Sequence, residues 1–95
     1  MNPNDSQQAS NLQIQINDTK RQIEKIGGVV TAMRATRERG GLPGDTIPAG
    51  MYPGAPMSYA SFVSARDAEI AALVSTLNTL RSQLQALGAN YSIGF

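Results

Sequence analysis

Residues 63–87 read VSARDAEIAALVSTLNTLRSQLQAL, and this stretch decides the fold because it carries two helical stripes at once. The first stripe is large and apolar, with the alternating three- and four-residue spacing of a heptad repeat. Its members are Val63, Ile70, Leu73, Leu77, Leu80, Leu84 and Leu87. This spacing predicts an amphipathic helix that packs against a second helix. Arg66 interrupts the stripe, either to set register or oligomeric state or because the helix end is frayed.

The second stripe has the same spacing on the opposite side of the helix and consists of small residues. Its members are Ala65, Ala68, Ala72, Ser75, Thr79, Ser82 and Ala86. The water-facing side of a surface helix normally carries charge, whereas this side carries methyl and hydroxyl groups. We therefore expect the helix to be packed on two sides, with Ala68, Ala72, Ser75 and Thr79 as interface residues.

A matching apolar stripe precedes this segment and predicts a first helix over about residues 11–39. The members of this stripe are Leu12, Ile16, Thr19, Ile23, Ile26, Val30 and Met33. Two starts fit the sequence: a cap at Asn2 with Pro3 in the first turn, or a capping box that begins at Ser10. Residues 12–16 also alternate as a short strand would, but the continuing heptad favours a helix.

Two glycines, Gly27 and Gly28, lie inside the first predicted helix. Each costs about 1 kcal/mol relative to alanine in a helix interior. They are either a tolerated weak point or a place where another backbone approaches closely. Gly40 and Gly41 follow the helix and are typical of a helix C-terminal cap.

The segment GGLPGDTIPAGMYPGAPMS, residues 40–58, is too rich in glycine and proline to be helical. It nevertheless carries Met51, Tyr52 and Met57. Methionine and aromatic side chains are favoured in interface cores. These three residues therefore either plug the end of a helical hairpin or form a docking surface for another protein.

The second helix is predicted over about residues 59–87, with Gly88 as its cap and an extended tail over 88–95. Tyr91, Ile93 and Phe95 alternate with smaller residues in this tail. Alternate side chains of an extended segment point the same way. We expect these three residues to contact either the chain's own hairpin or a neighbouring subunit.

Together these patterns predict an all-α fold over residues 1–95: one antiparallel, coiled-coil-like two-helix hairpin with a long connector, packed into a larger assembly. A hairpin of this size has a thin core, and such chains usually need a disulfide, a metal or oligomerisation. The sequence contains no cysteine. We therefore expect protein partners, either copies of the chain or larger host proteins.

The composition does not indicate a catalytic function. The chain has no histidine and no cysteine, and its seven carboxylates form no facing pair. We predict no enzyme activity, no catalytic, metal or cofactor-binding residue and no small-molecule substrate. Eight basic residues against seven acidic ones give no strong field for nucleic acid. We also expect no signal peptide and no membrane-spanning segment.

The function that fits these features is a non-enzymatic structural subunit of a large multi-chain particle. Its most concrete form is a viral, bacteriophage-like component of a capsid, neck or tail, which would be located in the virion. The alternative is a cytosolic coiled-coil adaptor or assembly chaperone that binds its client reversibly. Burial of the small stripe is the feature that distinguishes these two functions, and a well-folded stable monomer would contradict both.

Overall fold

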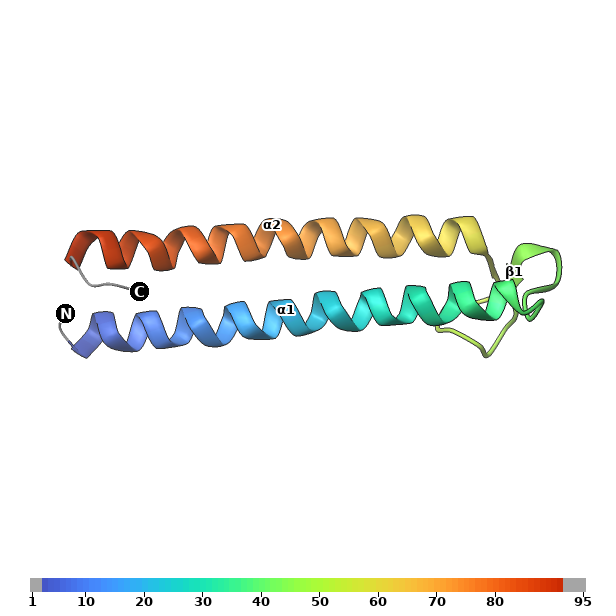
Figure 1. Cartoon of the computed structure of the whole chain (residues 1–95), viewed down its shortest axis with the longest axis horizontal. Coiled ribbons are helices and arrows are strands. Elements are labelled where there is room, and N and C mark those ends of the chain that lie inside the picture. Colours follow the sequence, from blue (N-terminus) through green and yellow to red (C-terminus); the bar gives the residue numbers. More distant parts are fainter. Residues whose placement is uncertain (1–2, 92–95) are drawn as a thin grey trace. The chain divides into compact units, whose positions relative to one another are not determined.

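The computed structural model describes residues 3–91 and shows a mostly helical chain, with two long helices joined by a connector (Figure 1). Helix α1 spans Pro3–Glu38 and helix α2 spans Tyr59–Tyr91. The connector holds a 3-10 helix, η1 (Pro43–Asp45), and two short strands, β1 (Thr46–Ile47) and β2 (Met57–Ser58). The described residues form two compact units: residues 24–71 make up unit 2, and residues 3–23 and 72–91 belong to unit 1.

Helix α1 starts and ends where local sequence signals favour it. It begins at Pro3 with Asp5 in its first turn, so the alternative start at Ser10 is wrong. Residues 12–16 are helical, which excludes the strand interpretation. After Glu38, Gly40 adopts a left-handed backbone with φ of 78°. The N–H of Gly40 bonds the carbonyl of Arg37 at 3.0 Å, and the N–H of Gly41 bonds that of Thr36 at 2.9 Å. This is the Schellman cap that the glycine pair predicts.

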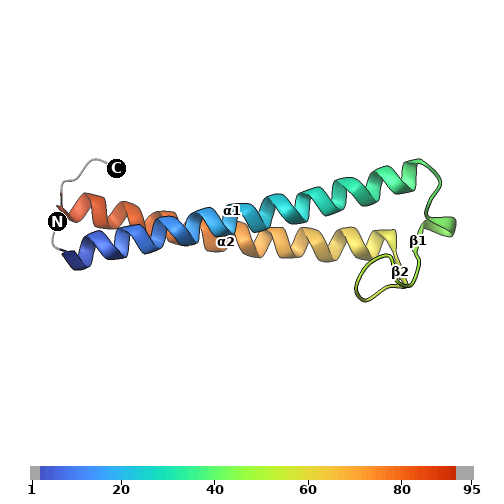
Figure 2. The same cartoon turned by 90° about the horizontal axis from the view of Figure 1, so that it is seen from below.

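Unit 1 is held together by the large apolar stripes of its two helix segments, which run in opposite directions (Figures 1 and 2). Its buried cluster consists of Leu12, Ile16, Leu77 and Leu80, with Ile23, Leu84 and Leu87 packed around it. Thr19 is also buried and donates its hydroxyl to the carbonyl of Gln15 at 2.8 Å. The packing of the two stripes is consistent with the predicted helical hairpin.

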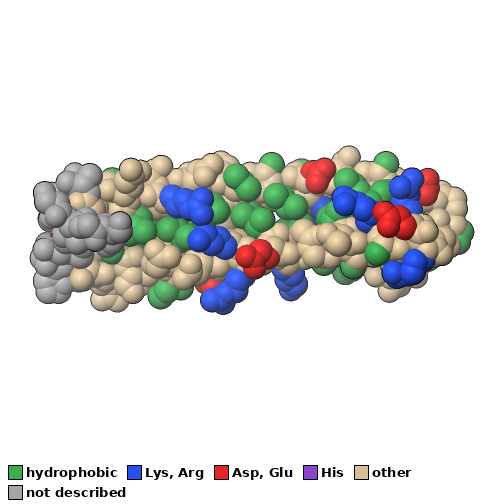
Figure 3. Space-filling view, in the orientation of Figure 1, with side chains coloured by type: hydrophobic (Ala, Val, Ile, Leu, Met, Phe, Trp, Pro, Cys, Tyr) green, Lys and Arg blue, Asp and Glu red, His purple; other side chains and the backbone are tan. Residues whose placement is uncertain are grey.

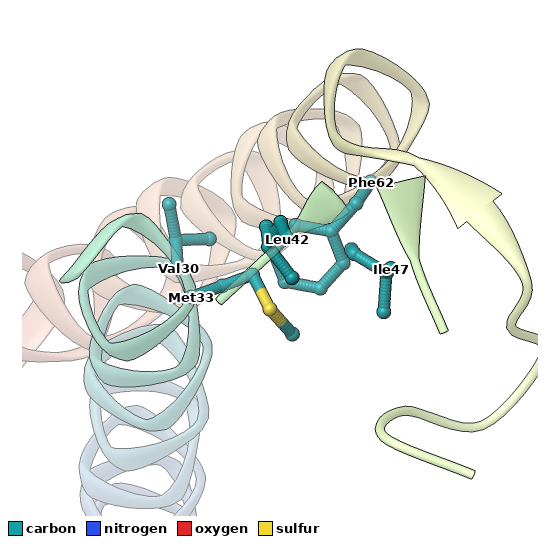
Figure 4. Close-up of a cluster of buried hydrophobic side chains, with 5 residues drawn as sticks. All are labelled: Val30, Met33, Leu42, Ile47 and Phe62. Carbon is teal, nitrogen blue, oxygen red and sulfur yellow. The ribbon is translucent and has the colours of Figure 1, made fainter. Parts of the chain in front are cut away.

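Unit 2 has a separate hydrophobic cluster, to which both the helices and the connector contribute. Its buried members are Val30, Met33, Leu42, Ile47 and Phe62. Figure 4 shows Met33, Leu42 and Ile47 next to the ring of Phe62, with Val30 on the same helix as Met33. Phe62 and Ile47 are both 0% exposed. The connector therefore folds back onto the helices instead of extending into solvent.

The connector, which the sequence predicts only to be non-helical, also contains a small antiparallel sheet. Thr46 pairs with Ser58, and Ile47 pairs with Met57. Strands of two residues are too short to produce a recognisable alternation in the sequence. They are stabilised by tertiary contacts, because Ile47 is buried in the unit 2 cluster.

Helix α2 begins at the expected place and extends further than expected. The hydroxyl of Ser58 accepts the N–H of Ser61 at 3.1 Å, which caps the helix start. At the other end the helix continues through Gly88 to Tyr91, so the predicted stop at Leu87 and the extended tail over 88–91 are wrong. Glycine in a helix is a modest cost and not a stop signal unless the backbone turns left-handed there. Ile93 and Phe95 lie outside the described residues.

Replacing Gly28 by alanine should raise the melting temperature. A Cβ built at Gly28 meets nothing within 4 Å, so alanine adds helix propensity without a clash. The expected gain is about 0.5–1 kcal/mol, measured by thermal unfolding followed by circular dichroism.

The matched control is Gly41→Ala. There a Cβ would lie 2.7 Å from Cγ2 and 3.1 Å from the carbonyl oxygen of Thr36, so this variant should be destabilised. If Gly28→Ala lowers the melting temperature instead, another backbone approaches this part of α1, which is the second interpretation of the glycine pair.

Candidate protein-interaction surface

The small stripe of α2 is exposed along its whole length, and we call it the small face. In unit 1 its exposed members are Ala72, Ser75, Thr79, Ser82 and Ala86, and in unit 2 they are Ala65 and Ala68. Every member of the large stripe is buried or half-buried. The structure therefore separates the two stripes by exposure as their spacing predicts. The predicted interface residues are all exposed, Ala68 in unit 2 and Ala72, Ser75 and Thr79 in unit 1.

The part of the small face in unit 1 is hollowed. A shallow depression of about 490 Å³ lies over α2, and the residues that line it come from this helix alone. They are Ser75, Asn78, Thr79, Ser82, Gln83 and Ala86. The depression exists because small side chains stand where a surface helix usually carries long ones.

Two threonine hydroxyls on this stretch of α2 already have acceptors inside the helix. Thr79 donates its hydroxyl to the carbonyl of Ser75 at 3.1 Å, and Thr76 donates to the carbonyl of Ala72 at 3.2 Å. A hydroxyl with an internal acceptor can be covered by another chain without leaving an unpaired donor. Burying Thr79 is therefore less costly than its residue type suggests.

The same stretch of α2 lacks charge. No charged residue occurs between Glu69 and Arg81, and Val74 on this stretch is 40% exposed. Charged side chains are depleted at interface cores because their desolvation is costly. Figure 3 shows Lys, Arg, Asp and Glu side chains in groups on the face that it draws, next to wide areas without charge.

The three connector residues predicted at an interface do not form one surface. Tyr52 and Met57 are half-buried and pack against the unit 2 cluster, which matches the interpretation of this set as a plug. Met51 is 46% exposed, so for this residue a role in docking another protein stays a prediction. Tyr91 is the last residue of α2, and Ile93 and Phe95 fall outside the described part of the chain.

Two arginines fasten the connector to the helices, a role that the stripe pattern did not reveal. Arg66 is not frayed: its side chain is 14% exposed and its Nη2 lies 2.9 Å from Oε1 of Glu69. It also donates a hydrogen bond to the hydroxyl of Tyr52. Arg37 binds Oδ1 of Asp45 through its Nε at 2.9 Å, and its guanidinium lies 4.8 Å from the ring centre of Tyr59.

The Arg37–Asp45 pair should make stability depend on pH. The hydrogen bond and the charge of Arg37 lower the pKa of Asp45 below its ordinary value of 3.8. A carboxylate with a lowered folded-state pKa stabilises the protein above its unfolded-state pKa, and this contribution is lost as the pH falls through the folded-state pKa. We expect wild type to melt higher than Asp45→Asn at neutral pH and the difference to vanish in acid.

The measurement is a series of thermal melts from neutral pH to well below the Asp45 pKa. Asparagine is the matched replacement because Asp45 has φ of 54°, a left-handed conformation that asparagine tolerates. A difference between the two proteins that stays constant with pH would show that the pair contributes through shape alone.

The described residues carry neither a metal-binding cluster nor a membrane-spanning helix. This part of the chain has no group of three or more carboxylates placed to hold a metal ion. Neither of its long helices is apolar enough over a sufficient length to cross a membrane. No family model, curated protein or solved structure matches the chain.

Proposed function

We propose that the chain is a non-enzymatic structural subunit that joins a larger protein assembly through the small face of α2. The observation that carries this proposal is the exposure of every small-face residue in a helix whose opposite side already packs on α1. The partner surface would be another protein subunit, either a second copy of the chain or a larger host protein.

The chemistry of the small face suits helix packing. Alanine loses no side-chain entropy on burial, and serine and threonine lose little. Short side chains also allow another helix to approach closely, so that many weak van der Waals contacts form at once. A helix of a partner subunit laid over Ala72, Ser75 and Thr79 would fill the depression in unit 1.

A viral particle of the bacteriophage type is the concrete assembly that we propose, with the chain in its capsid, neck or tail. Three features support this proposal: the chain is short, it carries little charge, and it has two small clusters in place of one large core. Small helical chains of this kind usually gain stability from neighbours. A reversible adaptor or assembly chaperone is the competing role.

Size-exclusion chromatography with light scattering tests the proposal on the purified full chain. An oligomer that persists on dilution supports a structural subunit. An oligomer that dissociates in the micromolar range supports the reversible adaptor instead. A well-folded monomer at every concentration would contradict assembly through copies of the chain, and a failure to bind any co-expressed partner would then contradict the proposal as a whole.

A further inference from the structure

Residues 48–56 form a loop between β1 and β2 that we call the strap. Seven of its nine residues are exposed, and only Tyr52 and Ala55 are half-buried against the unit 2 cluster. Its backbone bonds stay within it: the N–H of Met51 bonds the carbonyl of Pro48 at 3.2 Å, and the N–H of Ala55 bonds that of Tyr52 at 3.0 Å. The strap is therefore attached to the rest of unit 2 mainly by side chains and by its two ends.

Tyr52 makes the principal side-chain attachment. Its ring centre lies 5.0 Å from that of Phe62 at an interplanar angle of 85°, an edge-to-face contact. The guanidinium of Arg66 lies 5.0 Å from the Tyr52 ring centre and 5.5 Å from that of Phe62. Arg66 also donates a hydrogen bond to the Tyr52 hydroxyl. Its guanidinium forms a salt bridge with Glu69, which lies one turn further along α2.

We propose that Tyr52 and Arg66 form a latch, and that the strap opens as a unit when Tyr52 leaves while the helices and the β1–β2 pairing stay formed. The ends of the strap are fixed by the pairing of Ile47 with Met57. Gly50 and Gly54 have positive φ angles of 85° and 92°, and the prolines between and beside them limit bending elsewhere. Segments with few buried contacts open independently of the rest of a protein.

Opening would uncover a defined surface. Phe62, which is 0% exposed, would lose the ring that covers one of its edges. The guanidinium of Arg66 would lose its hydroxyl acceptor on the strap, and its Nε is already buried without a hydrogen-bond partner among the described residues. The open form would present an aromatic ring beside a cation. The strap is separate from the small face, and its opening needs no assembly partner.

Two methionines, Met57 and Met33, make the opening measurable. A Cβ placed on Gly54 would lie 3.5 Å from Cε of Met57, so the strap covers the Met57 methyl group. Met33 is 7% exposed inside the cluster and reports its loosening, so it is the reference for Met57. Their oxidation rates in dilute hydrogen peroxide can be followed separately by peptide mass spectrometry, because oxidation of methionine follows its exposure.

The Tyr52→Ala variant should oxidise at Met57 about tenfold faster than wild type, the size of change expected from losing one aromatic contact. Met33 should change by less than about twofold, because the cluster stays closed. The milder variant Tyr52→Phe keeps the ring, loses the hydroxyl acceptor of Arg66, and should show a smaller rise at Met57 only.

The matched control is Tyr59→Ala, which removes another tyrosine that packs on the same cluster from outside the strap. It should accelerate Met33 and Met57 together, because it loosens the cluster as a whole. If Tyr52→Ala also accelerates both methionines in parallel, or leaves Met57 unchanged, the strap does not open as a separate unit and the inference is wrong.

Discussion

Replacing Phe62 by alanine is expected to lower the free energy of unfolding by about 3–5 kcal/mol, the usual cost of removing a buried aromatic ring. Phe62 is 0% exposed, and the cluster around it draws on α1 and the connector as well as α2. Because a small domain is stable by only about 5–15 kcal/mol, this one change should remove much of the stability of unit 2. Urea unfolding followed by circular dichroism measures it.

The matched control for Phe62→Ala is Val74→Ala, which shortens an apolar side chain on the same helix. Val74 is 40% exposed and belongs to neither buried cluster. Its replacement should change the unfolding free energy by less than about 0.5 kcal/mol. A loss of similar size in both variants would mean that Phe62 is not the centre of the unit 2 packing.

Replacing Ala72 by glutamate is expected to abolish assembly while the free chain keeps its helicity. Ala72 is exposed on the small face, and glutamate is nearly as good a helix former as alanine. In the assembled state the added carboxylate would be covered by another subunit, at a desolvation cost of several kcal/mol. Light scattering measures the assembly, and far-UV circular dichroism measures the helix.

Gln85→Glu is the control for Ala72→Glu, because it adds the same charge at another exposed position of α2 outside the small face. It should assemble as wild type does. Normal assembly of Ala72→Glu would show that the small face is merely a solvent-facing side of the helix. A loss of assembly in both variants would show that net charge, and not position, is decisive.

The helix packing could be predicted from the sequence because it depends on short-range periodicity. Residues spaced three and four apart fall on one helix face wherever that helix lies. The spacing of Leu12, Ile16, Leu77 and Leu80 is therefore enough to identify them as buried, and they form the unit 1 cluster. Even Thr19 is correctly placed inside, because its position in the stripe outweighs its hydroxyl, which bonds the carbonyl of Gln15.

The connector could not be predicted in the same way, because its structure depends on contacts between residues far apart in sequence. The burial of Ile47 and the pairing of Thr46 with Ser58 follow from how the chain folds back on Phe62. Arg66 interrupts a stripe of large apolar residues, yet it packs well because Tyr52 supplies a ring and a hydroxyl acceptor from fourteen residues away. The local sequence pattern therefore predicts neither the contact of Ile47 with Phe62 nor that of Arg66 with Tyr52.

The end of α2 could not be predicted from the sequence for a different reason. Glycine after a leucine-rich helix is a common cap, but the backbone at a glycine can equally stay helical. Gly88 does so, and α2 continues to Tyr91. Sequence alone does not distinguish these two conformations when the following residues, here Ala89 and Asn90, are compatible with either.

The central claim is that the small face of α2 contacts another protein chain, and thiol labelling tests it most directly. The chain contains no cysteine, so Ser75→Cys places a single thiol in the depression on α2. Gln22→Cys, at an exposed position of α1, is the reference. The account predicts that assembly slows labelling at position 75 much more than at position 22, and that dilution to the free chain restores it. Equal labelling rates at both positions in the assembled protein would contradict the claim.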